Sequence, residues 1–117
     1  MADLLTPNAV VTNLLELARE LAKLSAGLDE LEADVVNKRE DYTRALARAE
    51  LSAEGDTVGE RHAKALLATG DERLAAELAE ALVRGRKRQL DSLKVRIDVG
   101  RSAAAALRAE MDLDRIR

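Results

Sequence analysis

The sequence contains an unbroken heptad register from Val10 to Ala49, in which eleven of twelve positions are apolar or amphipathic. A 3.5-residue period keeps such positions on one side of a long helix, where they need a partner helix to cover them. The pattern therefore predicts an all-α, coiled-coil-like chain. We call these positions the first seam, and they follow one another at alternating spacings of three and four residues: Val10, Leu14, Leu17, Leu21, Leu24, Leu28, Leu31, Val35, Lys38, Tyr42, Ala45 and Ala49.

The composition supports one helical domain spanning residues 1–117. Charged residues make up 35% of the chain and hydrophobic residues 47%, which is typical of long helices. Tyr42 is the only aromatic residue, so the predicted core is narrow and aliphatic. With no cysteine, disulfides and thiolate sites are excluded. The amino terminus lacks the pattern of a secretory signal and no run of eighteen apolar residues occurs, so we expect a cytoplasmic protein without a membrane partner.

Capping residues predict where the helices begin and end. Thr6 and Pro7 are a favourable helix start, and we expect the first helix over about residues 7–53. Residues 54–70 predict an elbow that contains a short helix, 58–68, started by a capping box of Thr57 and Glu60. The last helix is expected over about residues 71–112, a segment without proline.

The two long helices are predicted to fold back on each other as a long antiparallel helical hairpin. Matched lengths place Leu31 opposite the Leu93 region and Leu17 opposite the Leu107 region. Small residues near Gly100 allow another helix to come close. The expected seam of the last helix, interrupted at Arg86, consists of Leu74, Leu78, Leu82, Leu90, Leu93, Ile97, Gly100, Ala104, Leu107 and Met111.

A lone pair of helices offers one contact seam, which is little apolar area to offset the entropy of ordering the backbone. Further apolar residues beside the first seam widen its stripe: Val11, Leu15, Val36 and Leu46. The chain is therefore predicted to form a homodimer that is a four-helix bundle. The residues expected to carry core packing and assembly are Leu14, Leu17, Leu21, Leu24, Leu28, Leu31, Val35 and Tyr42.

No pattern for catalysis, cofactor binding or metal binding is present, so we expect a protein that is not an enzyme. His62 is the only histidine and has no second ligand at a metal-binding spacing. The serines lie in helical context without a nucleophile elbow, and the glycines lack the residues of a phosphate loop. Lys38, at a seam position, either fixes the register or extends its ammonium to the rim.

A basic cluster, Arg84, Arg86, Lys87 and Arg88, is the strongest local anomaly. On a helix, three of its four side chains share one face, where they could bind phosphates or an acidic partner. The other interpretation is charge pairing with Asp34, Glu40 and Asp41 across the hairpin. No aromatic residues interleave to stack bases, which favours pairing.

The stretch Ala49–Gly55, continued by Val58–Ala65 and a long charged helix, resembles small uncharacterised helical proteins of bacteriophages and prophages. In those proteins an Ala-rich helix, a glycine turn and an Arg-x-Ala-x-Ala stretch precede a second long helix. Their genes often lie among replication and recombination functions. The resemblance implies an accessory role and carries over no catalytic residue.

These observations predict a non-enzymatic protein-binding or assembly module that acts through homo-oligomerisation and an unidentified partner protein. One alternative is a nucleic-acid-binding accessory protein in replication or recombination that uses the basic cluster. Another alternative is a virion scaffolding or structural protein.

Overall fold

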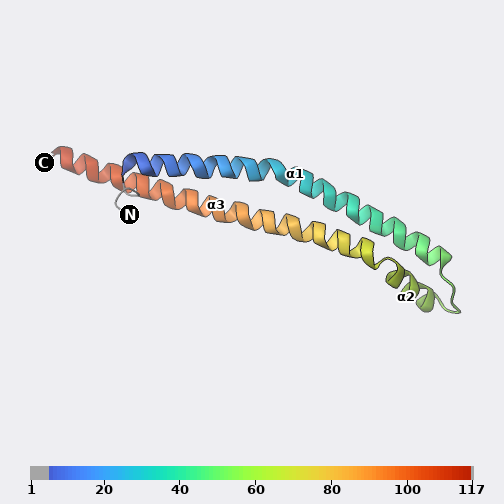
Figure 1. Ribbon diagram of the computed structural model, residues 1–117. Helices are drawn as coiled ribbons and strands as arrows, with labels where there is room; N and C mark the ends of the chain where they lie inside the picture. The colour runs from blue at the N-terminus through green and yellow to red at the C-terminus, as the bar shows by residue number, and fades with distance from the viewer. Residues whose placement is uncertain (1–5, 117) are drawn as a thin grey trace. The chain divides into compact units, whose positions relative to one another are not determined.

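The structure, a computed structural model, describes residues 6–116 and is helical throughout (Figure 1). Helix α1 covers Pro7–Ser52, α2 covers Val58–Ala68 and α3 covers Gly70–Ile116. Helix accounts for 94% of the described residues, which contain no strand. The predicted all-α class is therefore confirmed. In the same residues, no helix is both long enough and apolar enough to cross a membrane.

The helix starts follow from the predicted caps. The hydroxyl of Thr6 accepts a hydrogen bond from the N–H of Ala9 at 3.2 Å, and that of Thr57 accepts one from the N–H of Glu60 at 3.1 Å. The carboxylate of Glu60 accepts the N–H of Asp56 at 3.0 Å, one residue before the cap. These bonds satisfy N–H groups that the first turn leaves without a helical partner.

The chain forms two compact units. The first unit contains the α1 segment up to Gly27 and the α3 segment from Lys87, and the second contains Leu28–Arg86. In each unit, a segment of α1 lies beside an antiparallel segment of the chain that follows the turn (Figure 1). The second unit is therefore a helical hairpin.

The core of the second unit is small and aliphatic. Val35 of α1 packs with Ala79 and Val83 of α3, and Leu28 and Leu31 pack against this cluster. At its rim, Arg39 Nε donates to Glu80 Oε1 at 2.6 Å, so an ion pair also joins α1 to α3.

The prediction that Leu74, Leu78 and Leu82 face α1 is wrong. All three are more than half exposed, and smaller side chains take the inward positions. Counting back from Leu90 toward α2, the buried residues fall at heptad spacing. They are Val83, Ala79 and Ala76 of α3, Thr69 between the helices, and Ala65 of α2. Small residues are buried here because they let the helices approach closely, whereas the larger leucines lie on another face.

Residues 53–57 link α1 to α2, and Thr69 alone separates α2 from α3. Helix α2 contacts the last turn of α1, where His62 Nδ1 pairs with Glu50 Oε1. Because α2 occupies this length of α1, α3 is displaced toward the start of α1. Leu31 therefore packs beside Val83, and its predicted position opposite Leu93 is wrong.

In the first unit, Val10 and Leu17 of α1 and Leu90 and Leu93 of α3 are buried. Leu17 lies beside Arg96 and Gly100, so its predicted position opposite Leu107 is also wrong, by the same displacement. The close approach predicted near Gly100 is confirmed. A Cβ atom added to Gly100 would lie 2.6 Å from Leu14 Cδ2.

Candidate interaction surfaces

All twelve positions of the first seam are buried or half-buried within the chain. Val10, Leu17 and Val35 are the most enclosed of them. The eight residues predicted to carry core packing and assembly thus lie on the inward face of α1. Their role in contacts between chains remains a prediction.

Helix α3 has an inward face of the same kind in the first unit. We call this face the inner seam, and its residues are buried or half-buried: Leu90, Leu93, Ile97, Gly100, Ala104 and Leu107. They were predicted as seam residues of the last helix. Met111, predicted with them, is exposed and lines a groove at the end of the seam.

The opposite side of α3 carries a second apolar stripe that the sequence analysis missed. Two residues along a helix correspond to a rotation of about 200°, so positions two residues after each inner-seam residue lie on the back of α3. Three of them, Ser92, Val95 and Val99, also reach grooves beside α1. We call all of these exposed positions the outer seam: Ser92, Val95, Val99, Ser102, Ala106, Ala109, Leu113 and Ile116. The same alternating spacing that reveals the first seam would have found it.

Helix α1 has no such second stripe in this unit. The corresponding positions, two residues after each first-seam residue, are exposed and mostly polar or charged: Thr12, Glu16, Arg19, Lys23 and Ala26. This is the usual amphipathic pattern of a helix that packs on one side only. The contrast between the two helices therefore singles out the outer seam as an unusual surface.

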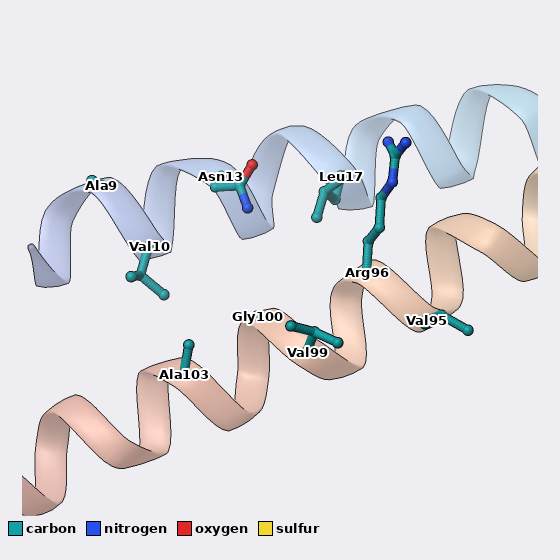
Figure 2. A pocket seen from close by; sticks show the side chains of 9 residues that line it. All are labelled: Ala9, Val10, Asn13, Leu17, Val95, Arg96, Val99, Gly100 and Ala103. Carbon is teal, nitrogen blue, oxygen red and sulfur yellow. The ribbon is translucent and has the colours of Figure 1, made fainter. Parts of the chain in front are cut away.

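Two open grooves flank the contact between α1 and α3 in the first unit. The larger, of about 550 Å³, is shown in Figure 2. Val10 and Leu17 point toward α3, and Arg96 extends from α3 toward α1 (Figure 2). Val95 and Val99 belong both to this groove and to the outer seam. The smaller groove lies near Pro7, Val11 and Met111, with a volume of about 240 Å³.

His62 is exposed and forms an ion pair with Glu50 when it is protonated, which ties α2 to α1. Beside it, Lys64 Nζ donates to the carbonyl of Glu54 at 2.5 Å and Arg61 to that of Gly55 at 3.0 Å. These bonds fasten the turn. Through its contact with Glu50, His62 takes part in holding α2 on α1.

Lys38 is half-buried at its seam position, and it lines a small pocket with Asp41, Asp71, Glu72 and Ala75. The side chains that line this pocket carry one positive and three negative charges, and Oε2 of Glu72 is buried without a hydrogen-bond partner. Within residues 6–116, no group of three His, Asp or Glu side chains is arranged to hold a metal ion.

The basic cluster lies on α3, with Arg84, Lys87 and Arg88 exposed and Arg86 half-buried. Arg86 occupies an inward heptad position, as the interrupted seam predicted. Each of the four residues takes part in an interaction. Pairing with acidic side chains and binding of phosphates both remain predictions for this cluster.

No known protein family, curated protein or solved structure matches the chain. The resemblance to phage and prophage proteins therefore remains a prediction from the residues that carry it.

Proposed function

We propose that the protein is a non-enzymatic helical assembly module that associates with itself and with a partner protein. The observation that carries this proposal is the balance between buried and exposed apolar side chains. Among the described residues, six large aliphatic side chains are buried: Val10, Leu17, Val35, Val83, Leu90 and Leu93. Fourteen large apolar side chains are exposed in the same part of the chain.

For an isolated chain in water, exposing more large apolar side chains than are buried is unfavourable. Single exposed apolar residues are common on protein surfaces, but contiguous apolar stripes usually mark an interaction surface. Here the exposed residues include runs at helical spacing, such as Leu74, Leu78 and Leu82. Helix faces of this kind bind other helices by close packing.

Sedimentation over about a hundred-fold range of protein concentration tests self-association, because a dimer gains population with concentration. We expect the average mass to rise from that of a monomer toward that of a dimer. A mass that stays monomeric over the whole range would contradict the self-association part of the proposal. The substitution Leu24→Asp cannot test self-association cleanly. Leu24 lies beside Leu93 within the chain, so its loss would disturb the fold.

Affinity capture from the native host, performed with and without nuclease, tests the partner. We expect a protein that is retained after nuclease treatment. Loss of all captured material with nuclease would instead favour the nucleic-acid-binding alternative, in which the basic cluster contacts phosphates. Growth of the sedimenting species well beyond a dimer would favour the virion scaffolding alternative.

A further inference from the structure

We propose that the outer seam of α3, from Ser92 to Ile116, binds the same seam of a second copy of the chain, with the two helices parallel. This inference rests on the proposed function, since it names the surface through which the protein associates with itself. It places the two α3 segments at the centre of the contact. In each first unit, the α1 segment lies on the far side of α3.

The outer seam combines large apolar residues with small ones. Val95, Val99, Leu113 and Ile116 are between 57% and 83% exposed, although each could be buried by one neighbouring helix. Between them lie Ser102, Ala106 and Ala109, which have short side chains. Large residues supply apolar area, and small residues let two helix backbones approach closely.

The spacing of the outer seam fits a helix partner with the same period. Its positions alternate at three and four residues over more than three heptads, as the a and d positions of a coiled coil do. In a parallel pair in register, each residue meets its own counterpart, so Val99 packs on Val99 of the second copy and Leu113 on Leu113 of the second copy. The stripe is therefore complementary to itself, as a two-fold contact requires.

The charges beside the outer seam select the orientation. One flank carries Asp91, Asp98 and Asp112, with Ala105 at the remaining heptad position. The other flank carries Arg96, Ala103 and Glu110. The two flanks thus differ in charge, and only one of them is uniformly acidic.

Parallel and antiparallel pairs bring different flanks together. In a parallel pair, each flank faces the other flank of the second copy five residues later. Asp91 then lies opposite Arg96 of the second copy, once that long side chain turns from α1 to the outer flank (Figure 2). In an antiparallel pair, like flanks meet, so the repulsion between Asp98 and Asp112 of the second copy cancels the attraction between Arg96 and Glu110 of the second copy. Opposite charges attract and like charges repel at this range, so the parallel arrangement is favoured.

The stripe ends at Arg88, the next outer-seam position toward the start of α3. Arg88 already takes part in an interaction of its own, and a parallel pair would bring two arginines together there. The contact is therefore confined to the segment from Ser92 onward. Along this segment, Val95 and Val99 also line the groove in Figure 2, so a helix on the outer seam covers the α3 rim of that groove.

The expected affinity is modest. A contact along 25 helical residues is about 37 Å long, which is shorter and narrower than most stable protein interfaces. The dimer should therefore dissociate on dilution.

Disulfide cross-linking tests both the surface and the orientation, because the chain has no cysteine of its own. We expect Ser92→Cys and Ser102→Cys to form covalent dimers under mild oxidation, since each serine meets its counterpart in a parallel pair. Ser25→Cys, at an exposed position of α1, is the matched control and should stay monomeric. A cross-link at Ser102 but not at Ser92 would overturn the parallel orientation. In an antiparallel pair, only residues near the middle of the seam, such as Ser102, lie close to their own counterparts.

A charge placed in the outer seam provides the second measurement. Val99→Asp should weaken self-association by at least about tenfold, because a charge would be buried in the contact. Thr12→Asp, on the polar face of α1, should change the strength of self-association by less than about twofold. Val99 is 64% exposed, so the folded chain tolerates the substitution, and circular dichroism verifies this.

The outcomes separate this inference from the proposed function. A wild-type chain that stays monomeric at all concentrations overturns both. A wild-type dimer that is unaffected by Val99→Asp and gives no cross-link at Ser92 overturns the outer seam alone. Binding of the outer seam only to a helix of a different protein would likewise overturn the assignment of a second copy.

Discussion

Helices α1 and α3 are nearly equal in length, but they differ in how many apolar faces they carry. Helix α1 has one seam, and the face opposite it in the first unit is mostly polar or charged. Helix α3 has an inner seam toward α1 and an outer seam on the other side, and its apolar residues are correspondingly less concentrated on one face. The number of apolar faces indicates the number of helical neighbours. In the proposed dimer, the outer seam of α3 gains a second helical neighbour, whereas α1 keeps the single neighbour that it has within the chain.

The largest expected effect compares the two faces of α3 directly. Leu93 on the inner seam is 3% exposed and Val95 on the outer seam is 61% exposed. Leu93→Ala should lower the free energy of unfolding by about 3 kcal/mol, because it leaves a cavity against α1. Val95→Ala should lower it by less than about 0.5 kcal/mol at a concentration where the chain is monomeric. Urea denaturation measures both, and equal losses would contradict the distinction between the faces.

A second comparison tests the corrected inward face of α3 in the second unit. Ala79 is buried against Val35 and Val83, whereas Leu78 beside it is more than half exposed. Ala79→Asp should cost about 2 kcal/mol of stability, since it buries a carboxylate without a partner. Leu78→Asp should have little effect. If thermal unfolding showed the larger loss for Leu78→Asp, the register predicted from the leucines would be right after all.

The smallest effect concerns two glycines of α3. Nothing lies within 4 Å of a Cβ atom added at Gly85, whereas at Gly100 such an atom would meet Leu14. Gly85→Ala should therefore raise the free energy of unfolding by about 1 kcal/mol through helix propensity. Gly100→Ala should raise the free energy of unfolding by less, because Leu14 has to move to make room for the added methyl group. Equal gains in urea denaturation would show that the approach of α1 at Gly100 is not tight.

Much of the fold follows from local sequence signals. The capping residues Thr6 and Thr57 placed two helix starts at Pro7 and Val58 without error. The regular spacing of the first seam identified the inward face of α1 along its whole length. Such signals act within one or two helical turns, and tertiary packing did not override them.

The alignment of the two helices was not predictable in this way. It depends on how α2 packs against the end of α1, with Ala65 almost fully buried, and no local signal specifies that contact. The choice of leucines at positions 74, 78 and 82 failed because size alone was used, while the constant heptad spacing pointed to Ala79 and Val83. The outer seam was visible in the spacing but could be recognised only once the side of α3 that faces α1 was known.

The opposed seams of α3 also restrict how the length of this helix can change. Inserting one residue after Arg101 would turn everything beyond it by about 100°, which moves Ala104 and Ala106 off their respective faces together. A gain or loss of seven residues would nearly restore both faces, because each repeats with that period. Changes in the length of α3 that preserve the protein should therefore come in whole heptads.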